Sequence, residues 1–220
     1  MKKKLTIIGA GGLGRIVYDV LHSDPSIQEE IEIAGFLDTR TDLVLPAELK
    51  SVILGSPFDY LPQPNEVFIP AVGNPQWRKD LVEPFAAKGA VFYSYFHKAA
   101  VAARTQIGPG CFITPGAVIS TDCKVGAFSY VDTYVVIGHD VEIGMHCMVG
   151  AMSFLAGGVR LGHGVAVHPR ATIAKDVVVG DGATIGIGSV VVKNVPAGAT
   201  VFGNPARTIF SESLCTAPPP

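Results

Sequence analysis

The chain has 220 residues, a formal net charge of −2 at pH 7, and 48% hydrophobic residues. This length fits one large or two small domains, and the apolar content is ample for a buried core. The small net charge gives no electrostatic basis for binding nucleic acid. No apolar run reaches the length that spans a bilayer, and the N-terminal MKKKLTIIGAGG meets glycines too early for a signal peptide, so we expect a cytoplasmic protein.

The N-terminal hundred residues alternate between strand and helix patterns. We expect strands at 4–8, 31–37 and 66–72, and helices at about 15–21 and 76–88. The proline-containing stretch at 45–64 is typical of irregular connections. The alternation predicts a small parallel α/β sheet, that is, a Rossmann-like domain.

A glycine-rich loop, Gly9–Gly14, joins the first strand to the first helix and satisfies the pattern GxGxxG. Asp38 ends the second strand, where an acidic residue would reach a ribose hydroxyl. Backbone N–H groups at a helix N-terminus bind any phosphate, including the diphosphate of a nucleotide sugar. Only about 100 residues precede the repeat described below, roughly half of a dinucleotide fold. We therefore interpret the loop as a nucleotide or sugar-phosphate site, with a nicotinamide-dependent oxidoreductase and a purely structural turn as alternatives.

From residue 101 to residue 191, every sixth residue is aliphatic. The series is Val101, Ile107, Ile113, Ile119, Val125, Val131, Ile137, Ile143, Val149, Leu155, Leu161, Val167, Ile173, Val179, Ile185 and Val191. A period of six is a multiple of the strand period, and hexapeptide repeats are typical of a β-helix. Three hexapeptides per coil place residues n and n+18 one above the other, which predicts a solenoid of about five coils.

Three cysteines, Cys111, Cys123 and Cys147, lie two residues before aliphatic positions, where most residues of the repeat are small. We expect buried reduced thiols rather than disulfides. No cysteine or histidine pair has the spacing of metal ligands, so no metal site is expected.

His139 follows the aliphatic column directly and is adjacent to Asp140. A histidine beside a carboxylate is a suitable general base, because the carboxylate fixes the tautomer and raises basicity. One coil along the solenoid, the residue facing His139 is Gly157, which leaves room for a thioester and offers a backbone N–H to a developing oxyanion. A solvated surface histidine is the alternative.

Several motifs in a fixed order resemble one family. They are the Gly9–Gly14 loop, Phe36-Leu37-Asp38, Gly73-Asn74 with Arg78, Phe96-His97-Lys98-Ala99, Gly138-His139-Asp140, Ala156-Gly157-Gly158, and Gly203-Asn204-Pro205-Ala206-Arg207. Their order over about residues 4–208 resembles the sialic acid O-acetyltransferase family. That family of hexapeptide-repeat acyltransferases includes bacterial N-acetyltransferases acting on nucleotide-linked amino sugars.

The resemblance implies a left-handed parallel β-helix over residues 98–210, a Rossmann-like nucleotide-sugar-binding domain over 1–97, and a tail at 211–220. It also implies a homotrimer with acetyl-CoA as co-substrate and a role in surface polysaccharide or glycoconjugate synthesis. In three positions the chain departs from the family: Leu13 and Met148 replace a common histidine, and Asp132 replaces a common asparagine.

The resemblance also implies a role for each site residue. His139 would be the catalytic base, Asp140 its orienting partner, and Gly157 the oxyanion donor. Acetyl-CoA would contact Met148, Gly157, Pro169 and Ile187, with Lys175, Lys193 and Arg207 as candidates for its phosphates. The nucleotide sugar would contact Gly11, Gly12, Leu13, Asp38, Thr39 and Gly73.

The sequence therefore predicts an acetyl-CoA-dependent N-acetyltransferase acting on a nucleotide-linked amino sugar, with direct transfer and no acyl-enzyme. Acetylation of a sugar hydroxyl by the same base is the nearest alternative, since an amine and a hydroxyl need the same proton acceptor. A non-catalytic binding or scaffold solenoid is a further alternative.

Overall fold

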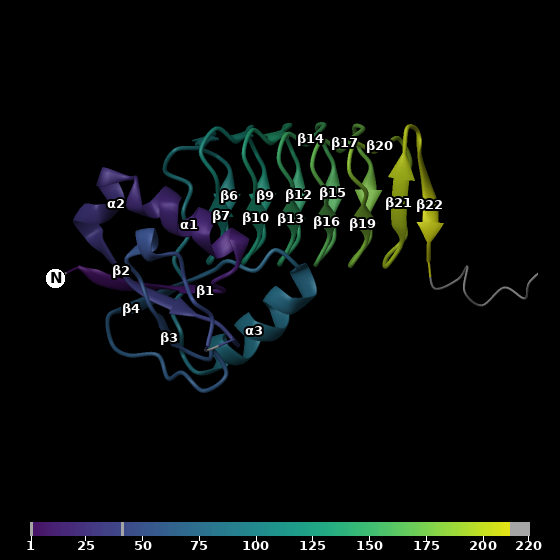
Figure 1. Cartoon of the computed structure of the whole chain (residues 1–220). Coiled ribbons are helices and arrows are strands. Elements are labelled where there is room, and N and C mark those ends of the chain that lie inside the picture. The colour runs from purple at the N-terminus through teal and green to yellow at the C-terminus, as the bar shows by residue number, and fades with distance from the viewer. Residues whose placement is uncertain (1, 41, 212–220) are drawn as a thin grey trace, which may run out of the picture. The chain divides into compact units, whose positions relative to one another are not determined.

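The computed structural model describes residues 2–40 and 42–211. The chain divides into two compact units, Met1–Ser94 and Tyr95–Pro220, which Figure 1 shows in purple to blue and in teal to yellow respectively. Except for Ser211, the expected tail at 211–220 lies outside the described residues.

The first unit is a four-stranded parallel sheet with the strand order β3-β2-β1-β4. Its strands are β1 (Lys3–Ile8), β2 (Ile31–Leu37), β3 (Ile53–Gly55) and β4 (Glu66–Pro70), and its helices are α1 (Gly12–His22), α2 (Pro25–Glu30), the 3-10 helix η1 (Ala47–Leu49) and α3 (Pro75–Ala87). The expected parallel α/β domain is therefore confirmed. Three elements were not expected: α2, η1 and the edge strand β3. Of these, η1 and β3 lie in the stretch 45–64, where irregular connections were expected.

The core of this unit forms because β1 is a central strand covered on both faces. Leu5, Ile7 and Ile8 of β1 are fully buried, as expected of a continuous apolar run in a parallel sheet. Phe68 of β4 packs edge-to-face on Phe85 of α3, with ring centroids 4.7 Å apart. This packing fixes α3, and with it the segment between β4 and α3, against the sheet.

The second unit is a solenoid whose short strands stack in three parallel sheets. Face 1 holds β7 (Phe112–Ile113), β10 (Tyr130–Val131), β13 (Met148–Val149), β16 (Ala166–Val167), β19 (Thr184–Ile185), β21 (Thr200–Gly203) and β22 (Ala206–Phe210). Face 2 holds β5 (Ala100–Val101), β8 (Val118–Ile119), β11 (Val136–Ile137), β14 (Phe154–Leu155), β17 (Thr172–Ile173) and β20 (Val190–Val191). Face 3 holds β6 (Gln106–Ile107), β9 (Lys124–Val125), β12 (Glu142–Ile143), β15 (Arg160–Leu161) and β18 (Val178–Val179).

The register confirms the eighteen-residue coil. Ile137 pairs with Ile119 on one side and with Leu155 on the other. In the inward column, the cysteines are free and buried as expected, and the Sγ of Cys123 donates to the carbonyl of Gly138 on the next coil at 3.1 Å. After the last parallel coil, β22 pairs antiparallel with β21 in a hairpin.

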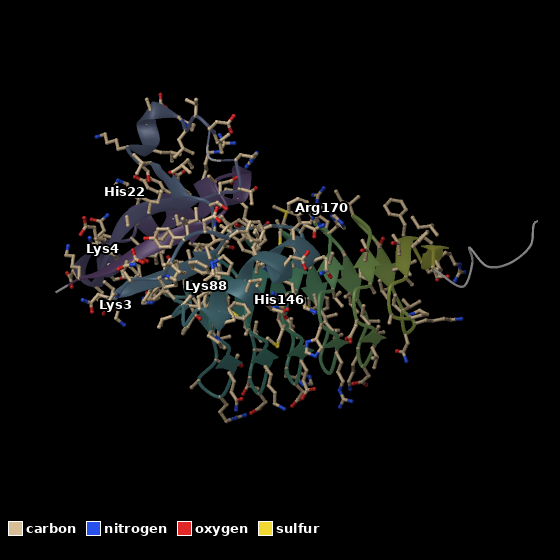
Figure 2. All side chains as sticks on the ribbon, turned by 90° about the horizontal axis from the view of Figure 1, so that it is seen from below. Lys3, Lys4, His22, Lys88, His146 and Arg170 are labelled. Atoms are coloured by element: carbon tan, nitrogen blue, oxygen red, sulfur yellow. The ribbon has the colours of Figure 1, made fainter. Side chains whose placement is uncertain are left out.

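The outward residues of the solenoid differ from face to face. On face 2, Val118, Val136 and Phe154 are 41–43% exposed. On face 3 the corresponding residues include Lys124, Glu142 and Arg160, and Lys124 pairs with Glu142 at 2.9 Å. Figure 2 shows side chains projecting from the outside of the coils. Face 2 is therefore an exposed apolar surface and face 3 a charged one.

None of the helices within residues 2–40 and 42–211 is both long and apolar enough to cross a membrane. Nor do the described His, Cys, Asp and Glu side chains form any group of three that could hold a metal ion.

Candidate active site

His139 lies on the corner that connects face 2 to face 3, between β11 and β12. Its Nδ1 is 2.7 Å from Oδ2 of Asp140, and both side chains are more than half exposed. Asp140 adopts a left-handed backbone conformation, with φ 58°, and its N–H donates to the carbonyl of Thr121 one coil earlier. A carboxylate that accepts from Nδ1–H leaves the lone pair of Nε2 free to take a proton.

Gly157 lies beneath the imidazole on the next coil. A Cβ at position 157 would be 2.6 Å from Nε2 of His139, so the ring occupies space that only glycine leaves open. The coils are tied here by the Gly158 N–H, which donates to the His139 carbonyl at 2.9 Å. The Gly157 N–H donates to no acceptor within residues 2–40 and 42–211, and it is therefore available to a ligand.

An ion pair lies on the same corner in the two coils before the His139–Asp140 pair, with Asp122 one coil earlier and Arg104 two coils earlier. Nε and Nη2 of Arg104 donate to the two carboxylate oxygens of Asp122, each at 2.6 Å. These charge-assisted bonds hold the pKa of Asp122 at about 2, and the electrostatic effect of His139 acts in the same direction. This pair belongs to none of the motifs recognised in the sequence, although the spacing 104, 122, 140 follows the eighteen-residue period.

Asp132, where the family commonly has asparagine, lies after β10 on the corner between faces 1 and 2. Its Oδ1 accepts from the Thr133 N–H at 2.7 Å and lies 3.4 Å from the buried hydroxyl of Tyr130. Burial raises the pKa of Tyr130, and the Asp132 carboxylate raises it further. The tyrosine therefore remains a neutral hydrogen-bond donor to Asp132.

The three other residues assigned to acetyl-CoA lie elsewhere on the solenoid. Met148 belongs to β13 of face 1, and Pro169 and Ile187 lie one coil apart on the corner between faces 1 and 2. Arg170, next to Pro169, projects from the outside of the solenoid (Figure 2). One copy of the solenoid therefore brings together His139, Asp140 and Gly157, but it places Pro169 and Ile187 at the opposite edge of face 2 and Met148 on face 1. Three lysine and arginine side chains named for the phosphates, Lys175, Lys193 and Arg207, are exposed.

The first unit contains a pocket of about 500 Å³. Its lining includes all six residues assigned to the nucleotide sugar, Gly11, Gly12, Leu13, Asp38, Thr39 and Gly73. Gly9 begins the loop with φ +105°, and a Cβ there would lie 2.8 Å from the carbonyl oxygen of Ala71. Gly11 is the N-cap of α1 and provides no side-chain cap, so the first N–H groups of the helix face no side-chain acceptor.

Sequence reasoning missed two side chains of this pocket, Arg40 and Trp77. Arg40 is bound to Asp38 through Nε and Nη2 at 2.9 and 3.0 Å, and its side chain is 57% exposed. Burial raises the pKa of Asp38, but the hydrogen bonds from the Arg40 side chain and from the Ala10 and Arg40 N–H groups outweigh this and lower it to about 2. Trp77, in the first turn of α3, is 62% exposed. Arg40 stands outside the GxGxxG pattern, and its position two residues after Asp38 was the only available signal.

Comparison with known families matches each unit to a different sequence model. Residues 4–85 match the PglD N-terminal domain, and residues 122–157 match the bacterial transferase hexapeptide (six repeats). A GDP-perosamine N-acetyltransferase of Escherichia coli O157:H7 is 30% identical over 141 residues. That match covers 63% of this chain and spans 63% of the length of the relative.

Two solved structures have a similar fold over nearly the whole chain. The acetyltransferase domain of PglB from Neisseria gonorrhoeae, in complex with acetyl coenzyme A, has a TM-score of 0.85 and 27% identity, and the match covers 95% of this chain and 100% of that one. PerB from Caulobacter crescentus, in complex with CoA and GDP-perosamine, has a TM-score of 0.82 and 25% identity, with 93% and 96% coverage. The resemblance is thus confirmed: both units of the chain are similar to those of hexapeptide-repeat, left-handed β-helix acetyltransferases.

Proposed function

We propose that the protein transfers the acetyl group of acetyl-CoA to the amine of a nucleotide-linked amino sugar. The observation that carries the proposal is the corner of the solenoid where His139, oriented by Asp140, lies against Gly157. This corner provides a base and an unengaged backbone N–H side by side, which are the two groups that acyl transfer to an amine requires.

His139 acts first as a base and then as an acid. Its Nε2 takes a proton from the sugar amine while the nitrogen forms a bond to the thioester carbonyl carbon. The carbonyl oxygen becomes an oxyanion, to which the Gly157 N–H donates. When the C–S bond breaks, the imidazolium returns the proton to the departing CoA sulfur, so His139 is neutral again and no acyl-enzyme forms. Asp140 stabilises the imidazolium between the two steps.

The pocket of the first unit supports a nucleotide sugar as the acceptor. It combines the glycine-rich loop, the uncapped start of α1 and Arg40, which suit a diphosphate, with Trp77, whose exposed ring suits a base or a sugar. One similar protein is named for GDP-perosamine, and a similar structure holds CoA and GDP-perosamine. These names favour a nucleotide-linked amino sugar for this chain as well.

We further propose that the active enzyme is a homotrimer. Pro169 and Ile187, both assigned to acetyl-CoA, lie at one edge of face 2, and His139 and Gly157 lie at the other. The residues at the two edges can contact the same acetyl-CoA molecule only if one edge of face 2 in one copy meets the opposite edge of face 2 in the next copy. The exposed Val118, Val136 and Phe154 of face 2 are an apolar surface that such packing would bury.

We place the enzyme in the cytoplasm and in surface polysaccharide or glycoconjugate synthesis. The buried free thiols of Cys111, Cys123 and Cys147 suit a reducing compartment. An N-acetylated nucleotide sugar is a donor for glycosyl transfer, and the family resemblance favours this use of the product.

The test is CoA release from acetyl-CoA across a panel of nucleotide-linked amino sugars beside the matching hydroxy sugars. We expect release with an amino sugar and a product that carries an N-acetyl group by mass spectrometry. Release with hydroxy sugars alone would assign the protein to O-acetylation instead. Release with neither, from protein that binds acetyl-CoA, would overturn the proposed transferase activity for these acceptors.

A further inference from the structure

Asp38 has no free acceptor site for a ligand. Its Oδ2 accepts from the Ala10 N–H at 2.8 Å and from Nη2 of Arg40 at 3.0 Å, and its Oδ1 accepts from the N–H and from Nε of Arg40, both at 2.9 Å. A carboxylate offers about four lone-pair sites, and here four donors occupy them. The side chain is only 7% exposed. Asp38 therefore differs from the sequence expectation, in which its carboxylate reaches a ribose hydroxyl.

Arg40 has donors left over. A guanidinium carries five N–H bonds in a planar fork. The Asp38 carboxylate takes one from Nε and one from Nη2. No other acceptor within residues 2–40 and 42–211 bonds to this side chain, which leaves three N–H bonds unused. The side chain is 57% exposed, and it is the one cation among the described residues that line the pocket.

The guanidinium of Arg40 lies beside the glycine-rich loop. Its Nη2 lies 3.9 Å from the place where a Cβ of Gly11 would be. The same Asp38 carboxylate holds both the loop, through the Ala10 N–H, and Arg40, through the fork. The carboxylate thus fixes the distance between the loop backbone and the cation. Asp38 acts here as a supporting residue that holds a ligand-contacting residue, Arg40, in place.

We propose that Arg40 is the side chain that binds the diphosphate of the nucleotide sugar, and that Asp38 is a positioning residue that aims it. A guanidinium already bonded along one edge presents the remaining donors in a fixed plane, which suits the bidentate recognition of a phosphate. This inference rests on the proposed function, because it identifies the polar contact that the acceptor makes in the pocket of the first unit.

Trp77 makes the proposal measurable without turnover. It is the single tryptophan of the chain and lines the same pocket. We would titrate GDP, UDP, guanosine and uridine into the full-length protein and follow Trp77 fluorescence, with calorimetry as a second readout. The variants are Arg40→Met, which removes the charge, and Arg40→Lys, which keeps the charge without the fork. Lys79→Met on α3 is the matched control, because it removes an exposed cation that does not line the pocket.

We expect Arg40→Met to weaken binding of the preferred nucleoside diphosphate by about 10- to 100-fold, and Arg40→Lys to recover part of the loss. Binding of the matching nucleoside should be unchanged, and the salt dependence of diphosphate binding should become shallower in Arg40→Met. Lys79→Met should bind as the wild type does.

Two results would overturn the role of Arg40 but leave the proposed function intact. One is diphosphate binding by Arg40→Met that equals that of the wild type. The other is an equal loss of nucleoside and diphosphate binding in Arg40→Met, which indicates a structural role. If the wild-type protein binds no nucleoside diphosphate, the nucleotide part of the proposed function fails together with this inference.

Discussion

Gly157 and His139 lie one above the other on successive coils, and the imidazole occupies the place that a side chain at 157 would take. The relationship has a chemical consequence. The proton acceptor Nε2 and the unengaged Gly157 N–H lie beside each other on adjacent coils, which suits a base and an oxyanion donor acting on one tetrahedral intermediate. The solenoid supplies this arrangement through its regular rise between coils, without a special loop.

Gly157→Ala should therefore lower kcat more than it lowers stability. The backbone at 157 does not need a positive φ, so alanine is sterically allowed there, but its Cβ would meet Nε2 of His139 at 2.6 Å. The imidazole is at the exposed end of a flexible side chain and can move away, which misaligns the base. We expect kcat to fall by about 10²-fold, as when a catalytic base is displaced. Steady-state kinetics and a thermal unfolding curve measure both effects.

A suitable comparison is Gly164→Ala, on the corner between faces 3 and 1, where a Cβ would meet nothing within 4 Å although φ is +65°. That variant carries backbone strain without contact to His139. Equal kcat in Gly157→Ala and the wild type would show that the position of the His139 imidazole against Gly157 is unimportant for turnover.

Asp140→Asn tests the orienting carboxylate. The substitution keeps the size of the side chain but removes the charge that stabilises the imidazolium, so kcat should fall while KM for acetyl-CoA stays nearly constant. Since the side chains of His139 and Asp140 are 58% and 66% exposed, water screens the pair, and we expect a loss of about 10-fold rather than the larger losses of buried triads. An unaltered kcat in Asp140→Asn would show that the 2.7 Å contact between His139 and Asp140 takes no part in the reaction.

The repeat is the part of the fold that could be predicted most completely. Its signal is local and periodic, so the buried series through Ile137 and the approach of His139 to Gly157 both follow from counting in steps of six and eighteen. The edge strand β3 could not be predicted in this way. It has three residues, and its place depends on pairing with β2, where Phe36 lies opposite Ile53.

The nucleotide-sugar pocket and the His139 site were also predictable only as far as their signals are local in the sequence. The position of the glycine-rich loop follows from its motif, and the structure places its residues in one pocket. The bond between Asp38 and Arg40 depends on a side-chain rotamer that no motif encodes. Pro169 and His139 are 30 residues apart, which is not a multiple of the eighteen-residue coil, so the sequence already implies that they lie on different corners. The sequence of one chain does not show how a second copy would bring these two corners together.

Asp38 gives the first unit a pH-dependent stability. Its pKa in the folded protein is about 2, below the ordinary value of 3.8. A lowered pKa stabilises the fold at pH values above 3.8, and this contribution is lost as the pH falls towards 2. With allowance for solvent around Arg40, we expect about 1–2 kcal/mol. Chemical denaturation at pH 7 and at pH 2.5 should show that Asp38→Asn is destabilised at pH 7 and that the difference shrinks at pH 2.5. A constant difference would contradict the assigned cause.

Val136→Lys should dissociate the proposed trimer. Val136 is 41% exposed in the middle of face 2, and a buried, unpaired lysine there would oppose association. The matched control is Val178→Lys, since Val178 is equally exposed but lies on the charged face 3. Size-exclusion chromatography with light scattering should give a single chain for Val136→Lys and three chains for the control. Three chains in both variants would exclude face 2 as the interface.

The most direct test of the central claim is the rate of CoA release by His139→Ala with an accepted nucleotide amino sugar, measured beside its affinity for acetyl-CoA. If His139 is the base of a direct transfer, kcat should fall by about 10²- to 10⁴-fold. The dissociation constant for acetyl-CoA should change by less than about 2-fold, because the imidazole acts on the amine. An unchanged kcat in His139→Ala, with acetyl-CoA still bound, would contradict the mechanism and move the search for the base away from this corner.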